Sequence, residues 1–339
     1  MSENKLNIAV IGCGVGKLHV EGMIKKGVQP YAICDPDPDR LAACKTEHNV
    51  EIAVSDYKEL VNDPNLDAVV IASPDHIHLE QVEAFLRAGK DVMCEKPMAL
   101  NLEDCEKMMQ IEKETGRILM IGQVCRFTPS FALAKQLISD GRIGDLTFIE
   151  SEYAHNYATA RGHNDWRMVP ERHGFIGGGC HAVDLLRWLA GDPIEVYAYE
   201  NHKSLLDWPT ADTAIAIYKF PNDVMGKVFV STGCKRNYTM RSVFYGTKGT
   251  IICDNTSATI TLFEETEGDL KSFTKPQELP VEVNNHNFGA EIEMFINALK
   301  SGSKSPVPSM EGASTVAVCC ATVESARDHK VVQIRYPQV

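Results

Sequence analysis

The chain has 339 residues, more than one ordinary hydrophobic core holds and enough for two domains. Its content of 44% hydrophobic and 24% charged residues is typical of globular proteins, and its net charge of −12 repels phosphate backbones, which argues against nucleic acid as a partner. The eleven cysteines include no CxxC pair and no framework spacing, so neither a disulfide scaffold nor a structural zinc site is expected. With no secretory pattern and no apolar run near the roughly 20 residues of a membrane span, we expect a cytoplasmic protein without a membrane partner.

The first 125 residues alternate short apolar runs with helical patterns. The predicted strands cover residues 6–12, 32–35, 68–72, 91–94 and 118–123. The predicted helices cover residues 19–26, 39–48, 57–62, 77–88 and 101–115, the last of which ends at the C-cap Gly116. Strands that alternate with helices form parallel sheets through right-handed crossovers. We therefore predict an α/β fold over residues 1–125, a Rossmann domain with a doubly wound parallel sheet.

The pattern changes after residue 127. Period-two segments, typical of antiparallel strands, cover residues 145–153, 194–200, 211–220, 224–232, 241–245, 250–254 and 258–263. Helices are predicted over residues 129–140, 179–189, 288–299 and 310–327. We therefore predict a second, α+β domain over residues 126–339, with a mostly antiparallel open sheet and helices on one face. The other face of this sheet favours a homo-oligomer, either a homodimer or a homotetramer.

A glycine-rich turn follows the first predicted strand. It consists of Gly12, Cys13, Gly14, Val15 and Gly16. Glycine lets the backbone approach a pyrophosphate, whose charge the following helix N-terminus stabilises. Asp35 ends the second predicted strand, where a carboxylate binds the ribose hydroxyls and repels a 2′-phosphate, so this region predicts NAD rather than NADP. The alternative is a flavodoxin-like turn that binds no dinucleotide.

A second motif, Glu95-Lys96-Pro97, follows the predicted strand over residues 91–94. Lys96 then lies at the carboxyl end of a parallel strand, where open α/β sheets bind their ligands. Pro97 favours a fixed backbone corner, which can contain a cis peptide bond. The alternative is an exposed Glu–Lys pair at the start of a loop.

Taken together, these motifs resemble the Gfo/Idh/MocA family, the group of glucose–fructose oxidoreductase and inositol dehydrogenase. The resemblance covers nearly the whole chain and rests on the glycine turn with His19, Ser73-Pro74-Asp75 with His78, Glu95-Lys96-Pro97, Trp166-Arg167 and residues 122–127, 138–149, 177–189 and 245–249. It implies an NAD-dependent dehydrogenase that oxidises a secondary hydroxyl of a sugar, glycoside or cyclitol, with the sugar C3 as the family-level expectation. It also implies two catalytic residues, Lys96 in contact with the reacting hydroxyl and His181 from the second domain.

The chemistry of an alcohol oxidation fits these residue types. A hydroxyl proton must leave as hydride passes to the nicotinamide, and either an amine beside that cationic ring or a neutral imidazole can accept it. Further cofactor-binding residues are expected at Ser73, Pro74, His78, Glu95, Lys96 and Gln123. Substrate-binding residues are expected at Lys96, Arg126, His155, Tyr157, Trp166, Arg167, Cys180, His181 and Asp184.

The sequence departs from its relatives before the second-domain histidine. Many members carry an aspartate four residues earlier, where this chain has Gly177. Asp184, His155 and His173 are the candidates for its place, and Asp184 has the alternative of a structural role on its helix. The four histidines between residues 155 and 181 lack zinc-site spacing, so we predict no metal.

Two other functions remain open at this point. One is a glycosidase or epimerase that uses transient oxidation on a bound cofactor. The other is a non-catalytic dinucleotide or sugar sensor; Lys96 and His181 weigh against it, and the missing aspartate weighs for it.

Overall fold

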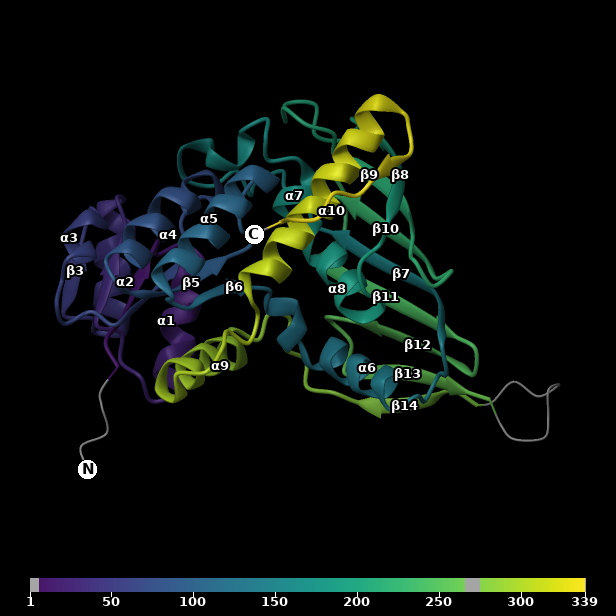
Figure 1. Cartoon of the computed structure of the whole chain (residues 1–339), viewed down its shortest axis with the longest axis horizontal. Coiled ribbons are helices and arrows are strands. Elements are labelled where there is room, and N and C mark those ends of the chain that lie inside the picture. Colours follow the sequence, from purple (N-terminus) through teal and green to yellow (C-terminus); the bar gives the residue numbers. More distant parts are fainter. Residues whose placement is uncertain (1–5, 266–274, 339) are drawn as a thin grey trace. The chain divides into compact units, whose positions relative to one another are not determined.

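The computed structural model describes residues 6–265 and 275–338. Within them the chain forms two compact units (Figure 1). Among the described residues, unit 1 holds residues 6–123, 288–314 and 337–338, and unit 2 holds residues 124–265, 275–287 and 315–336. No helix among the described residues is both long and apolar enough to cross a membrane.

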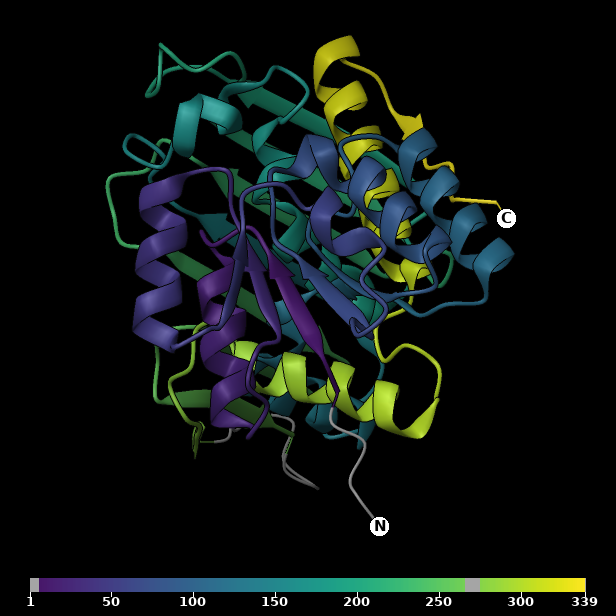
Figure 2. The same cartoon turned by 90° about the vertical axis from the view of Figure 1, so that its left-hand side faces the viewer.

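This division differs from the expected boundary after residue 125, because a late segment of the chain returns to unit 1. Helix α9 (Phe288–Ser301) packs beside α1 (Gly16–Lys25), as Figure 2 shows. The packing is close: a Cβ atom at Gly22 would lie 3.2 Å from both Ile292 Cγ2 and the Phe288 carbonyl oxygen. A boundary drawn along the sequence cannot show such a return.

Unit 1 contains a six-stranded sheet with the order β3-β2-β1-β4-β5-β6, and every pairing is parallel. Its strands are β1 (Ile8–Ile11), β2 (Ala32–Cys34), β3 (Ile52–Val54), β4 (Ala68–Ile71), β5 (Asp91–Glu95) and β6 (Leu119–Gly122). The strand order reverses between β1 and β4, the point at which doubly wound sheets bind ligands. This confirms the predicted Rossmann fold. Strand β3 was not predicted, because it has three residues at the sheet edge and none is fully buried.

The helices of unit 1 follow the predicted pattern. Besides α1 and α9 they are α2 (Pro38–His48), α3 (Lys58–Val61), α4 (His78–Arg87), α5 (Leu102–Thr115) and the short η1 (Asp75–Ile77). The Asn101 side chain accepts a hydrogen bond from the Asp104 N–H at the start of α5, and Gly116 ends this helix with a φ of 64°. The C-cap at Gly116 was predicted from the sequence, and the structure adds Asn101 as the N-cap.

Unit 2 contains a nine-stranded sheet with the order β14-β13-β12-β11-β7-β10-β9-β8-β15. Its strands are β7 (Leu146–Ala154), β8 (Glu195–Asn201), β9 (Thr213–Lys219), β10 (Met225–Ser231), β11 (Thr239–Gly246), β12 (Gly249–Asp254), β13 (Thr259–Glu264), β14 (Gln277–Pro280) and β15 (Val332–Gln333). All pairings are antiparallel except β7 with β10, which confirms a mostly antiparallel sheet. Strands β14 and β15 were not predicted, because both are short edge strands without a clear alternating pattern.

The helices of unit 2 lie on one side of this sheet, as expected (Figure 1). They are α6 (Pro129–Ser139), α8 (Cys180–Ala190) and the part of α10 (Ser309–Asp328) from Thr315 onward, together with η2 (Val124–Phe127), η3 (His163–Met168) and α7 (Gly174–Gly177). Along β9 the buried Ala214, Ala216 and Tyr218 alternate with exposed residues. The single turn α7 was not predicted, because its glycine-rich sequence lacks helical periodicity.

Candidate functional site

The glycine turn of unit 1 has little space for side chains at two of its positions. Gly12 has a φ of +95°, and a Cβ atom there would lie 2.6 Å from the Ala72 carbonyl oxygen at the end of β4. At Gly16 a Cβ atom would lie 2.8 Å from Val10 Cγ1, so α1 packs tightly on β1. Gly14, by contrast, is exposed. The turn therefore presents open backbone beside a helix N-terminus at the switch point of the sheet, which fits a pyrophosphate.

Asp35 connects the end of β2 to this turn. Its carboxylate accepts hydrogen bonds from the Cys13 N–H at 2.7 Å and from the Asp37 N–H at 2.9 Å. Arg40 lies in α2, yet its Nη1 is only 3.5 Å from Asp35 Oδ2. An acidic group thus lies next to the glycine turn, the position of the ribose-binding carboxylate in NAD-binding domains.

His78 connects the two neighbouring loops after β4 and β5. Its Nδ1 lies 3.1 Å from the Pro97 carbonyl oxygen, and its Nε2 lies 3.1 Å from that of Ser73. The ring is fully buried. The Ser73 hydroxyl in turn donates to Gln81 at 2.7 Å, and the peptide bond between Lys96 and Pro97 is cis. This placement indicates that His78 holds two loops in position.

Glu95 fixes the backbone that carries Lys96. One carboxylate oxygen lies 2.7 Å from His19 Nε2, and the other accepts a hydrogen bond from the Lys96 N–H at 3.1 Å. Burial raises the pKa of Glu95, but the hydrogen bond from His19 and the charges of His19 and Lys96 outweigh it and bring the pKa below its ordinary value. An ionised, buried carboxylate therefore supports the corner at which the half-buried Lys96 lies.

Glu291 of α9, which was not among the predicted site residues, lies in the same cluster. Ligand atoms of His19, Glu95 and Glu291 all lie within 4.8 Å of one another. Glu291 is fully buried, and among the described residues neither of its carboxyl oxygens has a hydrogen-bond partner. Burial and the nearby charge of Glu95 raise the pKa of Glu291 well above its ordinary value. The only signal in the sequence was a carboxylate beside Ile292 in a predicted helix.

The last predicted cofactor residue, Gln123, follows β6 and is buried. Its backbone N–H donates to the Ile121 carbonyl oxygen at 2.8 Å. Among the described residues its side-chain Oε1 has no hydrogen-bond partner.

In unit 2, aromatic and imidazole side chains form a cluster. The Tyr153 hydroxyl lies 3.1 Å from His155 Nδ1 and 2.9 Å from the Tyr157 hydroxyl. The ring of His155 lies 4.8 Å from that of Tyr238, whose hydroxyl is 3.1 Å from His286 Nε2. The structure thus brings together the predicted His155 and Tyr157. It adds Tyr238 and His286, which are isolated residues without a sequence motif.

His181 belongs to the same cluster. Its Nδ1 lies 3.2 Å from Cys125 Sγ, and its ring stacks against those of Tyr153 and His286 at centroid distances of 6.0 and 5.3 Å. His181 is 2% exposed and Cys125 is 1% exposed. The predicted His181 therefore lies among hydroxyl, thiol and imidazole groups, whereas Cys125 was not among the predicted site residues.

Arg126 and Asp184, both predicted to bind substrate, bind each other. Two hydrogen bonds, at 2.9 and 2.7 Å, join the Arg126 guanidinium to the Asp184 carboxylate. The Thr315 hydroxyl donates to the same carboxylate at 3.2 Å. Asp184 is fully buried and the Arg126 side chain is 8% exposed. This geometry favours the structural alternative for Asp184, because its oxygens are occupied within unit 2.

Gly177 borders a guanidinium. A Cβ atom at this position would collide with the guanidinium of Arg172, whose Nη2 donates to the Gly177 carbonyl oxygen at 3.1 Å. A side chain here, such as the aspartate of relatives, would require Arg172 to move. Of the candidates for its place, His173 instead pairs with Glu200 at 3.0 Å.

Three further predicted substrate residues lie near this stretch. The Trp166 ring lies 4.8 Å from the guanidinium carbon of Arg167 and 5.0 Å from that of Arg172, so it stacks with cations. Cys180 begins α8 and is buried, with its Sγ 3.9 Å from the Gly178 carbonyl oxygen.

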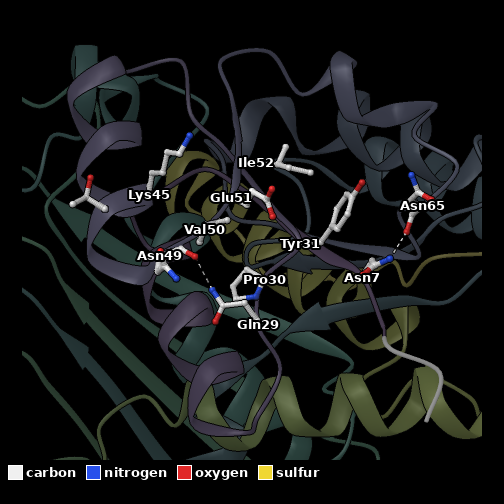
Figure 3. Close-up of a pocket in the computed structure, with 11 residues that line it drawn as sticks. Asn7, Gln29, Pro30, Tyr31, Lys45, Asn49, Val50, Glu51, Ile52 and Asn65 are labelled. Carbon is white, nitrogen blue, oxygen red and sulfur yellow. Dashed lines mark hydrogen bonds between the residues drawn. The ribbon is translucent and has the colours of Figure 1, made fainter. Parts of the chain in front are cut away.

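Figure 3 shows a hollow elsewhere in unit 1. Asn7, Tyr31, Glu51 and Asn65 are among its lining residues, and Asn7 Nδ2 donates to the Asn65 carbonyl oxygen at 2.8 Å. These residues precede strands β1 to β4, at the amino ends of the parallel strands. Because ligands of such sheets bind at the carboxyl ends, this hollow is not the cofactor site.

Comparisons with known proteins agree with this geometry. A family model described as "Oxidoreductase family, NAD-binding Rossmann fold" matches residues 6–123, and one described as "GFO/IDH/MocA C-terminal domain" matches residues 131–252. Myo-inositol 2-dehydrogenase of Thermotoga maritima is 29% identical, with 97% of this chain and 98% of the relative covered. Inositol 2-dehydrogenase 2 of Saccharopolyspora erythraea is 32% identical, with 78% and 77% covered. A solved levoglucosan dehydrogenase in complex with NADH shares the fold, with a TM-score of 0.87 at 23% identity and 98% and 100% of the chains covered. The chain therefore belongs to the Gfo/Idh/MocA family and is an NAD-dependent oxidoreductase.

Proposed function

We propose that this enzyme oxidises a secondary hydroxyl of a cyclitol, or of a related sugar or glycoside, and passes the hydride to NAD. The relatives named inositol dehydrogenase support this substrate class. The chemistry of unit 2 supports it too, because a polyol needs closely spaced donors and acceptors, which Tyr153, His155 and Tyr157 supply.

The observation that carries the proposal is the corner after β5. Lys96 follows a parallel strand at the same sheet edge as the glycine turn, and Glu95 and His78 hold its backbone in place. NAD, when bound, supplies the hydride acceptor. Lys96 orients the reacting hydroxyl and accepts its proton, a contribution of about 10²–10⁴-fold to the rate.

We assign the cofactor to the open backbone from Gly12 to Gly16, with Asp35 on the ribose and Ser73, Pro74 and Gln123 at the neighbouring strand ends. Glu95 and His78 act on the cofactor side by positioning loops, because their polar atoms bind protein groups.

In unit 2, His181 assists the proton transfer, and its ring is oriented by Tyr153 and Cys125. His155, Tyr157, Trp166, Arg167 and Cys180 contact the substrate. Arg126 and Asp184 serve as positioning residues that fix α8, the helix carrying His181. Lys96 belongs to unit 1 and His181 to unit 2.

We further propose a homo-oligomer formed through the uncovered face of the nine-stranded sheet. Tyr199, Ile217 and Met225 on this face are 58%, 57% and 56% exposed, and contiguous apolar exposure of this kind is typical of subunit interfaces. Light scattering should give a mass above that of one chain, and Ile217→Glu should lower it. A monomeric wild type would contradict this assembly.

We also propose a reducing, cytoplasmic setting, because it fits eleven cysteines that are all free thiols.

The deciding experiment is NADH formation with NAD and a panel of cyclitols and sugars, including myo-inositol, scyllo-inositol and levoglucosan. The wild type should turn over at least one of them, and Lys96→Ala should lower kcat by about 10²–10⁴-fold. The circular dichroism spectrum and the midpoint of urea unfolding should be nearly unchanged in Lys96→Ala, which serves as the control for folding.

Two results would overturn the proposal. One is tight NAD binding without turnover of any panel member, as expected of a sensor. The other is full activity in Lys96→Ala. A glycosidase or epimerase that oxidises transiently would give product without net NADH, and the dehydrogenase names of the relatives do not favour it.

A further inference from the structure

Three potential metal ligands converge in unit 2. Cys125 comes from η2, His181 from α8 and His286 from the segment before α9. The Cys125 sulfur and one nitrogen of each histidine all lie within 4.8 Å of one another. A thiol and two imidazoles form a ligand set typical of zinc sites that keep an open fourth position.

The spacing suits tetrahedral coordination. With the usual zinc bond lengths, a thiolate sulfur and an imidazole nitrogen on the same ion lie about 3.5 Å apart. Cys125 Sγ and His181 Nδ1 are 3.2 Å apart, close to this value, and the ligand atom of His286 lies within 4.8 Å of both. The thioether of Met240 lies 3.4 Å from Cys125 Sγ and adds a second soft sulfur beside the cluster.

Neighbouring groups orient the two imidazole rings. The Tyr238 hydroxyl lies 3.1 Å from His286 Nε2, and the Tyr153 ring stacks on that of His181 at 6.0 Å. Metal-binding histidines commonly have a hydrogen-bond partner at the second ring nitrogen, as the Tyr238 hydroxyl provides for His286, which fixes the ring and raises its basicity. The ligands themselves include no carboxylate, so they favour a thiophilic ion over Mg²⁺ or Ca²⁺.

We propose that Cys125, His181 and His286 form a binding site for Zn²⁺. On binding, Cys125 loses its thiol proton to the solvent and coordinates as a thiolate. The ion then occupies a nitrogen of His181 and removes this residue from proton transfer. Zn²⁺ is therefore an inhibitor of the dehydrogenase; this consequence rests on the proposed function, whereas the binding itself does not.

The test uses the full chain, freed of metal with a chelator and titrated with Co²⁺ as a spectroscopic probe for Zn²⁺. The wild type should show a thiolate-to-cobalt charge-transfer band, which equimolar Zn²⁺ should abolish. Cys125→Ser should lose the band. The matched control is Cys234→Ser, which removes a more accessible thiol of the same unit and should keep it.

Graded variants sharpen the result. His286→Ala removes a ligand and should weaken Co²⁺ binding by at least about 100-fold, while Tyr238→Phe removes only an orienting partner and should weaken it by about 10–100-fold. Circular dichroism and NAD binding show whether each variant folds. If Cys125→Ser does not fold, Co²⁺ binding by His286→Ala tests the site instead, because the side chain of His286 is only half-buried.

The outcomes separate this proposal from the proposed function. No charge-transfer band in the wild type, or a band that persists in Cys125→Ser and in His286→Ala, would overturn the site. Zn²⁺ should also suppress NADH formation in the wild type, a chelator should restore it, and the activity of His286→Ala should resist the ion. A wild type that shows the band but oxidises no substrate would overturn the proposed function and leave the metal site supported.

Discussion

The cluster of polar residues in unit 1 and the cluster in unit 2 are built in different ways. In unit 1 the polar groups lie in short contiguous motifs, and their side chains bind backbone groups. Asp35 accepts a hydrogen bond from the Cys13 N–H, and Glu95 accepts one from the Lys96 N–H. His78 lies within hydrogen-bond distance of two backbone carbonyl oxygens. In unit 2 single side chains from distant segments bind one another, as Tyr153 does with His155 and His181 with Cys125. A substitution in a unit 1 motif therefore disturbs the backbone that the side chain holds, whereas one in unit 2 removes a partner from another side chain.

The largest effect on stability is expected at the buried pair of His19 and Glu95 in unit 1. Glu95→Gln removes the charge that faces His19 and should lower the free energy of unfolding by about 3 kcal/mol. The pKa of Glu95 lies below its ordinary value of 4.5, so its contribution is present above that pH and is lost as the pH falls through the folded-state pKa. Urea denaturation should therefore show a smaller difference between variant and wild type in acid than at neutral pH. The control is Glu114→Gln at a surface pair with Arg87, where a loss of stability as large as that of Glu95→Gln would contradict the difference expected between buried and exposed pairs.

The corresponding change in unit 2 is Asp184→Asn. It weakens the two hydrogen bonds to Arg126 and should lower the free energy of unfolding by about 2 kcal/mol. KM should stay near the wild-type value, because the carboxylate is occupied by protein groups. A large rise in KM with unchanged stability would return Asp184 to the substrate-binding residues. Asp192→Asn, at a half-exposed partner of Arg187, is the control.

Glu95 and Asp184 also show which features of the site can be predicted from the sequence. The position of Glu95 at the carboxyl end of β5 was predictable, since a strand followed by a short motif places its residues by local geometry alone. Asp184 was predicted to bind substrate, yet its partner Arg126 lies 58 residues earlier in the chain. The contacts of Cys125, Tyr238 and His286 likewise depend on tertiary packing, to which a single sequence gives no local signal. The same reason explains the unexpected return of α9 to unit 1, whereas the missed edge strands are too short to show a pattern.

A smaller effect is expected on the preference of the enzyme for NAD over NADP. Asp35→Ser removes the carboxylate beside the glycine turn, and Arg40 is already placed within 3.5 Å of that position. The ratio of kcat/KM for NADP to that for NAD should rise at least about tenfold, a change of about 1.4 kcal/mol. Adding Arg40→Ala to Asp35→Ser should remove most of this gain. An unchanged ratio in Asp35→Ser would show that the carboxylate does not set cofactor choice.

The smallest expected effect concerns Glu291. Burial raises its pKa well above 4.5, so the folded state holds a proton that the unfolded state releases, and stability falls as the pH rises from 4.5 toward the folded-state pKa. Glu291→Gln should therefore be more stable than the wild type at about pH 8 and nearly equal to it at about pH 4. Glu293→Gln, an exposed neighbour on α9, is the control. A Glu291→Gln variant that loses stability with rising pH as the wild type does would contradict this account.

The most direct test of the central claim follows the hydride itself. Myo-inositol, or whichever panel member is oxidised, is supplied with deuterium on the reacting carbon together with NAD, and mass spectrometry locates the label. Direct oxidation predicts deuterium in the reduced cofactor, a keto product in equal amount, and loss of both in Lys96→Ala. Product without reduced cofactor, or label found in the solvent, would contradict the proposed dehydrogenase.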